Sequence, residues 1–378
     1  MITAKKRFIT ALDGGKPDRL PVTTHHLMDY FLNKYVGGMD GLEFHKQYGF
    51  DPIVWSIGPA PDESKGQYLD PVSNLICDAN WRVSTEEVPG QAYYTIRYHI
   101  YTPLGELTCC ISKNEITDWV TEHLIKDEKD MELYVKYCPS YYADVEACNA
   151  LAEKVGEDAL VRGAVVSAQP YGQPGVFQDL ACLMGTEKLI LACYDDPDWV
   201  KEAESAILER KLAYARSLKG AKMDIIEDGG GDGSCSVISP KMFREFVQPY
   251  DAPVIEALHQ SGIRVVYHTC GKMMPILEDI ADMGVDAMET FTPVNMGADA
   301  DLREAKRRIG SRVCMIGGFD QHNDLHGCTE QQTRDAVRRC FDEAGENGAF
   351  ILSPSDHFFD ADPHLILAMT DEAHKCVY

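Results

Sequence analysis

From about residue 115 onward, short apolar runs alternate with longer amphipathic stretches, and this alternation constrains the fold more than any other feature of the chain. Each apolar run has the length of a strand that is buried on both faces, and each intervening stretch is long enough for a helix. Strands of this kind, each followed by a helix, are typical of parallel α/β proteins. The apolar runs cover residues 159–166, 223–227, 263–268, 285–289, 312–317 and 348–353, and clear helical stretches cover 240–260, 274–283 and 330–346.

The strand ends favour a barrel over an open, doubly wound sheet. The chain has no Gly-x-Gly-x-x-Gly fingerprint after its first strand and no Gly-x-x-x-x-Gly-Lys-Ser/Thr phosphate loop. The glycine-rich segment 229–233 lacks the spacing and the lysine of such loops, so it is either a flexible loop or one that contacts substrate. Polar residues instead follow nearly every strand, where barrel enzymes build their active sites. The sequence therefore predicts an α/β protein with a (β/α)8 TIM barrel.

The first part of the chain has a different pattern. Residues 20–24 form a candidate first strand, and residues 93–100 and 105–111 are rich in aromatic and β-branched residues. The turn from Thr102 to Gly105 separates these two segments, so they are expected to form an antiparallel hairpin. We predict a single domain over residues 1–378, with an N-terminal extension over 1–115 that carries the hairpin and the main βα repeats over 116–378.

The composition excludes several classes of partner. Thirty-six basic residues against sixty acidic residues give a net charge of −24, which repels the phosphate backbone of nucleic acids. No stretch approaches the roughly 18 apolar residues of a membrane span, and the N-terminus lacks the apolar core of a signal peptide. The thirteen cysteines are scattered and odd in number, which favours reduced thiols. We therefore expect a cytoplasmic protein in which the adjacent Cys109 and Cys110 serve packing.

The segment Tyr267-His268-Thr269-Cys270-Gly271 is the strongest candidate for chemistry. Because side chains repeat every second residue along a strand, His268 and Cys270 can point the same way at a strand end. Imidazole and thiolate are ligands that zinc prefers, and a catalytic zinc needs one more protein ligand and an open position. His357 and Asp356 follow the last strand and are the candidates for that third ligand.

Other strand ends supply candidate catalytic and substrate-binding residues. Glu227 and Asp228 end one strand and Glu289 ends another, and their carboxylates could act as general acid or as ligands. Each carboxylate alone is more often a helix or loop cap, and aromatic side chains are often barrel core. Of the adjacent His25 and His26, one is expected to point outward. Candidate substrate contacts are His25, Tyr171, Tyr267, Phe291, Asp320 and Phe358.

The run from Ser236 to Pro363 resembles the uroporphyrinogen decarboxylase superfamily, especially its corrinoid-dependent methyltransferase branch. Residues 237–250 are similar to an Ile-Ser-Pro segment of that branch, and His268-x-Cys270-Gly271 is similar to its zinc half-site. Residues 312–320 are similar to its Gly-Asn-Val-Asp strand, and residues 350–357 to its Leu-Ser-Pro-Gly-Cys segment. Thr102-Pro103-Leu104-Gly105 is similar to the early hairpin turn of the family.

Two departures from the family limit what the resemblance implies. Uroporphyrinogen decarboxylases carry early arginines that hold the substrate propionates, whereas residues 21–30 contain no arginine. Coenzyme M methyltransferases carry a cysteine where Asp356 stands here. A carboxylate or imidazole in that place makes a harder zinc site, which favours a methyl acceptor or donor other than coenzyme M.

The resemblance implies a methyltransferase that moves a methyl group between a small methylated substrate, such as a methoxylated aromatic compound, and a corrinoid. The chain has no Asp-x-His-x-x-Gly corrinoid motif, so the corrinoid (cobalamin) would arrive on a small partner protein. Zinc would assist the reaction, and family members are often homodimers. The alternatives are a decarboxylase acting on a porphyrinogen or another carboxylated substrate, and a non-catalytic barrel that binds a corrinoid or another ligand.

Overall fold

A seven-stranded parallel sheet forms the centre of the computed structural model, which describes residues 2–56, 58–167 and 169–378. Its strands follow the spatial order β1-β10-β11-β12-β13-β14-β15, and each pair of neighbours is parallel. The strands are β1 (Ile53–Trp55), β10 (Leu160–Ala164), β11 (Ile225–Gly229), β12 (Arg264–His268), β13 (Ala287–Thr290), β14 (Cys314–Phe319) and β15 (Phe350–Pro354).

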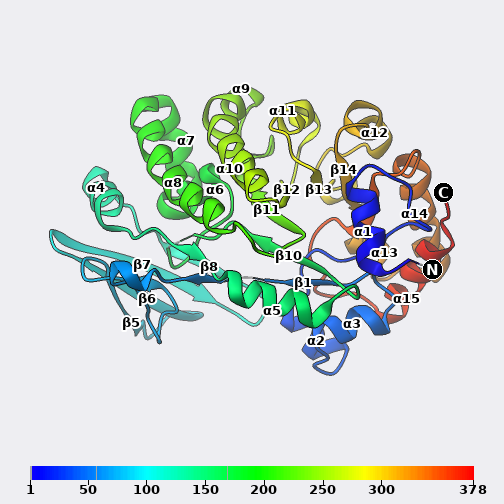
Figure 1. Ribbon diagram of the computed structural model, residues 1–378, viewed down its shortest axis with the longest axis horizontal. Helices are drawn as coiled ribbons and strands as arrows, with labels where there is room; N and C mark the ends of the chain where they lie inside the picture. The colour runs from blue at the N-terminus through cyan, green and yellow to red at the C-terminus, as the bar shows by residue number, and fades with distance from the viewer. Residues whose placement is uncertain (1, 57, 168) are drawn as a thin grey trace.

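Six of these strands coincide with the apolar runs of the sequence, and the helices between them surround the curled sheet (Figure 1). The first helices are α1 (Ala4–Leu12), α2 (Asp29–Tyr35), α3 (Gly41–Gln47), α4 (Glu128–Tyr137), α5 (Val145–Val155), α6 (Val176–Met184), α7 (Thr186–Asp195) and α8 (Pro197–Ser217). The others are α9 (Pro240–Met242), α10 (Gln248–Gln260), α11 (Leu277–Asp282), α12 (Leu302–Ile309), α13 (Gln321–Asp324), α14 (Glu330–Ala344) and α15 (Pro363–Lys375).

Local sequence signals explain where several of these helices begin. A capping box starts α14, because the Thr329 hydroxyl accepts from the Gln332 backbone while the Gln332 side chain binds the Thr329 backbone. The stretch predicted as one helix over 240–260 is interrupted by a π-helical turn, Phe243–Val247, between α9 and α10. The stretch over 274–283 likewise begins with a 3-10 turn before α11.

The segment that was expected to be the first barrel strand lies beside the last strand of the sheet. Val22 makes an isolated parallel bridge with Leu352 of β15, and the Thr23 N–H donates to the Leu352 carbonyl. On its other side, the Val22 carbonyl accepts from the Asp51 N–H, just before β1. The described residues thus show a curled seven-stranded sheet with this segment between its edges, and the complete eight-stranded barrel stays a prediction.

Alternating side chains of the strands divide the interior into two parts. In β12, Val265 and Tyr267 face the helices, whereas Val266 and His268 face the inside of the curl. The inner apolar residues pack with Phe8, Ala11 and Leu12 of α1 and form an apolar floor. Its other members, mostly from the sheet strands, are Ile53, Leu160, Ile225, Val266, Ala287, Cys314, Ile316 and Ile351.

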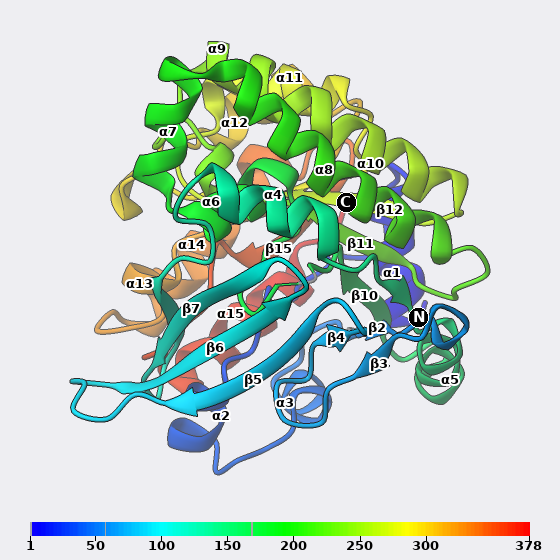
Figure 2. The same cartoon turned by 90° about the vertical axis from the view of Figure 1, so that its left-hand side faces the viewer.

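A second, antiparallel sheet precedes the main repeats (Figure 2). Its strands are β5 (Arg82–Glu87), β6 (Tyr94–Thr102), β7 (Gly105–Lys113) and β8 (Asp118–Glu122). β6 and β7 pair antiparallel up to Thr102 and Gly105, as expected for the hairpin. Cys109 and Cys110 lie buried in β7, where burial raises the pKa of Cys109 to about 12, in keeping with a packing role.

Four very short strands complete the structure: β2 (Pro59–Ala60) pairs with β9 (Tyr142–Ala143), and β3 (Tyr68–Leu69) pairs with β4 (Ile76–Cys77). None of the helices in the described part of the chain combines the length and the apolar character needed to cross a bilayer. The division into a single domain with an extension over 1–115 stays a prediction.

Candidate active site

A layer of polar side chains lies above the apolar floor, at the carboxyl ends of the strands. The inward positions of β1, β10, β11, β12 and β13 carry Trp55, Arg162, Glu227, His268 and Glu289, respectively. Each of these residues comes two positions after an inward apolar residue of the same strand, so it faces the same interior. Along each strand the inward side chains therefore change from apolar at the floor to polar or amphipathic at the carboxyl end. Carboxyl ends of parallel strands are where α/β proteins build active sites.

Arg162 joins two of the predicted catalytic carboxylates. Its guanidinium donates to Glu227 at 2.6 Å and to both oxygens of Glu289, at 2.5 and 2.8 Å, and all three residues are buried. The guanidinium also lies 4.6 Å from the centre of the Trp55 ring. Burial acts to raise the pKa of Glu289, but the charge of Arg162, followed by the contacts with His25 and His268, outweighs it and holds this pKa well below its usual range. Glu289 is therefore a stable anion.

Glu289 also orients His268, and His268 contacts Cys270. The Nδ1 atom of His268 lies 2.9 Å from the Glu289 Oε1 atom, while its Nε2 atom lies 2.9 Å from the Cys270 Sγ atom. A carboxylate on one imidazole nitrogen is the usual outer-sphere support of a metal-binding histidine, because it fixes the tautomer and the ring plane. Nitrogen and sulfur donors side by side suit zinc. The donor set of His268 and Cys270 therefore fits two positions of a zinc site.

The two candidates for the third ligand differ in their surroundings. The Asp356 Oδ1 atom lies 2.7 Å from the His357 Nδ1 atom, so the two side chains contact each other. Burial acts to raise the pKa of Asp356, but His357 and then His268 hold it below its usual value. His357 gathers with His25 and His26 rather than with Cys270: the donor atoms of the three histidines lie within 4.8 Å of one another.

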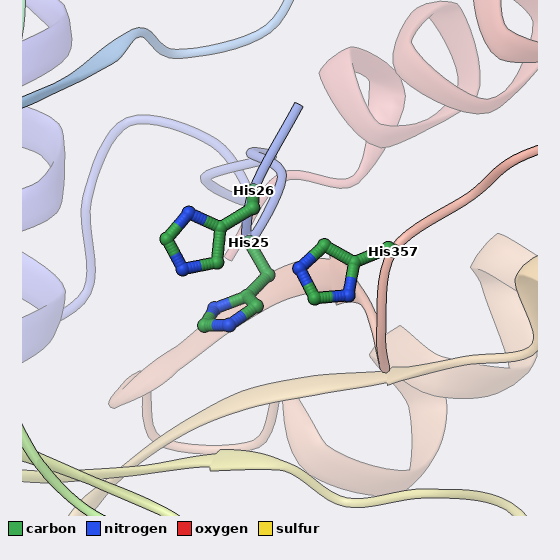
Figure 3. A group of neighbouring side chains, drawn as sticks. All are labelled: His25, His26 and His357. Carbon is green, nitrogen blue, oxygen red and sulfur yellow. The ribbon is translucent and has the colours of Figure 1, made fainter. Parts of the chain in front are cut away.

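Figure 3 shows these three imidazole rings turned toward one another from two separate segments of the chain. The His26 and His357 rings are stacked with centres 5.3 Å apart, and the His25 ring lies 4.3 Å from that of His26. His25 also stacks on His268 at 4.8 Å. Burial, followed by the neighbouring His25, Arg162 and His357, lowers the pKa of His26, so its imidazole is neutral at pH 7. Of the adjacent histidines, neither points away from the site.

Two cavities are lined in part by these three histidines. One, of about 600 Å³, is lined by Asp356, His357, Phe358 and Phe359 together with Met296 and Gln321. The other, of about 280 Å³, is lined by His25, His26 and Trp55. Phe358, a predicted substrate contact, borders the larger cavity while its ring packs edge-on against Phe31.

Three predicted site residues lie on the opposite side of the sheet from this layer. Tyr267 faces the helices, and its hydroxyl donates to the Asp251 carboxyl of α10 at 2.7 Å. Asp228 is fully buried on the same side, and burial, reinforced by the Asp251 charge, raises its pKa well above the usual value. Phe291 is fully buried in the helix-facing core. Tyr267 and Asp228 are immediate neighbours of inward residues, so the strand period turns both toward the helices. Phe291 follows the end of β13, where the positive φ angles of Thr290 (82°) and Phe291 (45°) break the strand period.

Two further predicted contacts serve local structure. Asp320 is buried and caps α13, since its carboxylate accepts from the Asn323 N–H at 2.9 Å and from the Asn323 side chain at 2.7 Å. Tyr171 is half-buried, and its hydroxyl donates to the Asp118 carbonyl at the start of β8, at 3.4 Å. Neither residue belongs to the histidine and carboxylate groups described above.

The sequence analysis missed Arg162, Trp55 and the role of His26. Arg162 carried a usable signal, because an arginine within an otherwise apolar strand run needs a buried counter-charge. Trp55 belongs to a short strand whose inward face no periodicity revealed. His26 was set aside because adjacent residues of a strand point to opposite faces, but His25 and His26 lie just after the strand-like segment, where that rule ends.

Comparisons with known proteins show which family the chain is related to. Residues 106–376 match the family described as Uroporphyrinogen decarboxylase (URO-D). The chain is 26% identical over 177 residues to the methylcobamide:CoM methyltransferase MtaA of Methanosarcina barkeri, covering 47% of this chain and 48% of that protein. It is 28% identical over 188 residues to the uroporphyrinogen decarboxylase of Thioalkalivibrio sulfidiphilus, covering 48% of this chain and 50% of that protein. The matched region thus spans about half the length of these curated relatives.

The solved structure of a methyltransferase from Methanosarcina mazei shares the fold. It superposes with a TM-score of 0.64 at 16% identity and covers 99% of both chains. The family match extends over most of the chain, from the β6–β7 turn to the end of α15. The chain therefore belongs to the uroporphyrinogen decarboxylase superfamily, within which it resembles the methylcobamide-dependent methyltransferases.

Proposed function

We propose that this protein is a methyltransferase that transfers a methyl group between a small methylated substrate and a corrinoid carried by a partner protein, with the assistance of zinc. The observation that carries the proposal is the row of contacts Glu289–His268–Cys270, which runs from a buried carboxylate to a partly exposed thiol. It presents an oriented imidazole and a thiol to one point at the carboxyl end of the sheet. The similarity to MtaA, whose name describes transfer from a methylated cobamide, supports the reaction class.

The residues of the proposed metal site and their neighbours have distinct roles. His268 and Cys270 would hold the metal, and Asp356, at the edge of the larger cavity, is the proposed third ligand. A bound zinc would act as a Lewis acid on the substrate heteroatom. Glu289 holds the Nδ1 atom of His268, so that its Nε2 atom remains directed at Cys270. Arg162 keeps Glu289 ionised and Glu227 in place.

The larger cavity suits a small, partly aromatic substrate. Phe358, Phe359 and Met296 provide an apolar wall, while Gln321 and Asp356 provide polar contacts. A volume of about 600 Å³ lies within the range of pockets for small molecules. A methoxylated aromatic compound matches these walls, and methyl transfer from its ether oxygen would need an electrophilic group beside that oxygen.

A porphyrinogen decarboxylase is disfavoured by the distribution of cations. Residues 21–30 carry no arginine, and the buried Arg162 is already engaged by Glu227 and Glu289. A substrate with several carboxylates would therefore lack counter-charges at this part of the site. The relatives nevertheless include uroporphyrinogen decarboxylases whose sequence identity to this chain is comparable to that of MtaA, so uroporphyrinogen belongs among the substrates tested.

The test is methylation of cob(I)alamin by the purified zinc-loaded protein, screened over methoxylated aromatic and other methyl donors. We expect turnover that falls about 100-fold or more in His268→Ala and Cys270→Ser, because a metal acting as a Lewis acid contributes several kcal/mol. Cys235→Ser is the matched control, since Cys235 is a partly buried cysteine on another segment, and it should retain activity. Full activity of Cys270→Ser, or turnover of uroporphyrinogen alone, would refute the proposal.

The same proposal places the protein in the cytoplasm, where its corrinoid partner is accessible and its thirteen free cysteines stay reduced. We also propose that the protein forms a homodimer. Size-exclusion chromatography with light scattering tests the dimer, and co-purification with a corrinoid protein tests the partner.

A further inference from the structure

The three histidines of Figure 3 come from segments that are far apart in the chain but meet at one point. His25 and His26 follow the strand-like segment that bridges to β15, and His357 follows β15 itself. One donor atom from each lies within 4.8 Å of the others. The fold therefore brings three imidazoles together at the mouth of the curled sheet.

A carboxylate contacts the Nδ1 atom of His357, as at many metal-binding histidines, whereas the Nδ1 atom of His25 lies near both the Arg162 guanidinium, at 3.5 Å, and the Glu289 carboxylate. The Nδ1 atom of His357 lies 2.7 Å from the Asp356 carboxylate, and the Nδ1 atom of His25 lies 3.4 Å from the Glu289 carboxylate. A carboxylate on Nδ1 fixes the tautomer and leaves Nε2 with a free lone pair. The third ring, His26, is held by stacking on Trp55 with ring centres 4.0 Å apart and planes 17° from parallel.

Packing alone explains this arrangement poorly. Stacked imidazoles bring like dipoles together, and the ring nitrogens that meet no protein partner in the described part of the chain are not sealed from solvent but border the two cavities. Among the hydrogen bonds of the described residues, none uses a nitrogen of His26 or the Nε2 atom of His25 or His357. A ligand that accepts three nitrogen lone pairs at once would satisfy all three rings.

We propose that His25, His26 and His357 form a second metal site, separate from the His268–Cys270 pair, which binds a divalent transition metal such as Zn²⁺ through three imidazole nitrogens. Three imidazoles suit zinc, cobalt, nickel and copper, and three protein ligands leave a coordination position open. The three histidines border two cavities from which a ligand could reach the metal, one lined by His357 and the other by His25 and His26. The inference does not depend on the reaction proposed above.

The second site gives His357 a role other than the one predicted from the sequence. In this arrangement His357 is not the third ligand of the His268–Cys270 pair, and Asp356, which contacts the Nδ1 atom of His357 through one carboxylate oxygen, remains the proposed third ligand of that pair. The two sites are neighbours, since the His25 and His268 rings are stacked with centres 4.8 Å apart. They differ in chemistry, because one contains a thiolate and the other only nitrogen donors.

Cobalt substitution separates the two sites, since thiolate ligation gives Co²⁺ an intense charge-transfer absorption that imidazole ligation does not. The apo-protein, prepared with a chelator, is titrated with Co²⁺, and metal content is measured by elemental analysis. We expect the wild type to bind two Co²⁺ per chain and to show the thiolate band. His26→Ala and His357→Ala should each bind one and keep the band. Cys270→Ser should bind one and lose the band.

His364→Ala is the matched control, because His364 is an exposed histidine, and it should bind two Co²⁺. Far-UV circular dichroism checks that each variant is folded, and His26→Gln replaces His26→Ala if the smaller side chain disturbs folding. The proposal is overturned if His26 and His357 variants bind as much Co²⁺ as the wild type. It is also overturned if a folded His26 variant loses both the second metal and the thiolate band, because the residues would then belong to one composite site.

Discussion

Arg162 is the position at which the structure makes its most quantitative prediction. Its guanidinium is the cation that both buried carboxylates, Glu227 and Glu289, contact directly. The side chains of the three residues expose only 5%, 8% and 3% of their surface, so water cannot replace the guanidinium. Arg162→Met keeps most of the volume of the side chain but leaves two buried carboxylates without this partner.

Removing one partner of a buried ion pair costs about 3–5 kcal/mol, because the remaining charge stays desolvated. We therefore expect Arg162→Met to lower the free energy of unfolding by at least that range, measured by urea denaturation followed by circular dichroism. Arg338→Met is the matched control: Arg338 pairs with Glu372 near the surface and should cost less than about 1 kcal/mol.

The pH dependence gives a second check on the same variant. In the wild type the pKa of Glu289 is depressed, so its stabilising contribution is present above the ordinary value of 4.5 and is lost as pH falls through the folded value. Without Arg162, burial raises the pKa of Glu289, and the variant gains stability as pH falls. The difference in unfolding free energy between the wild type and Arg162→Met should therefore become smaller as pH falls. A loss below about 1 kcal/mol at pH 7, or a gap that widens in acid, would refute the reasoning.

Four further predictions test other parts of the structure. Glu289→Gln should weaken metal binding by His268 and Cys270 about 10–100-fold, measured by competition with a chromogenic chelator, because an orienting carboxylate is lost. Burial raises the pKa of Glu204 well above 4.5, and its oxygens meet no hydrogen-bond partner among the described residues. The stabilising contribution of Glu204 is fully present below pH 4.5 and is lost as pH rises toward the folded pKa, because the unfolded chain ionises first. Glu204→Gln should therefore gain stability over the wild type progressively from pH 4.5 upward in thermal unfolding. Gly317→Ala should lose at least about 2 kcal/mol in urea unfolding, because φ is +125° and a Cβ atom would lie 2.2 Å from the Thr290 carbonyl oxygen, whereas Gly41→Ala, with its nearest atom at 3.5 Å, should not. Tyr267→Phe should lose about 1–2 kcal/mol of stability with an unchanged KM for the methyl donor; a raised KM would restore Tyr267 as a substrate contact.

Strand positions could be predicted from the sequence because burial on both faces leaves a simple apolar signature. The runs around Val265 and Ile351 each became a strand of the parallel sheet. Helix interiors were less certain, since the π-helical turn Phe243–Val247 depends on tertiary packing rather than on local propensity. The bridge between Val22 and Leu352 joins segments from the two ends of the chain, and no local pattern encodes such a long-range pairing.

Candidate site residues were predicted where one strand end supplied both partners, as with His268 and Cys270. The prediction failed where it ignored the alternation of the strand: Asp228 is the immediate neighbour of Glu227, and Tyr267 of His268, so each faces the helices. Arg162 was missed because its counter-charges lie 65 and 127 residues further along the chain. Such pairs become visible only when the strands are placed side by side.

The apolar floor formed by α1 has a kinetic consequence. Phe8, Ala11 and Leu12 fill the end of the curled sheet opposite the polar layer. Under the proposed function, the substrate and the protein-borne corrinoid would therefore have to approach through the same opening. A small molecule can pass before the larger partner covers that opening, but not after. Steady-state measurements should therefore fit an ordered sequential scheme in which excess carrier protein inhibits turnover by docking on the substrate-free enzyme.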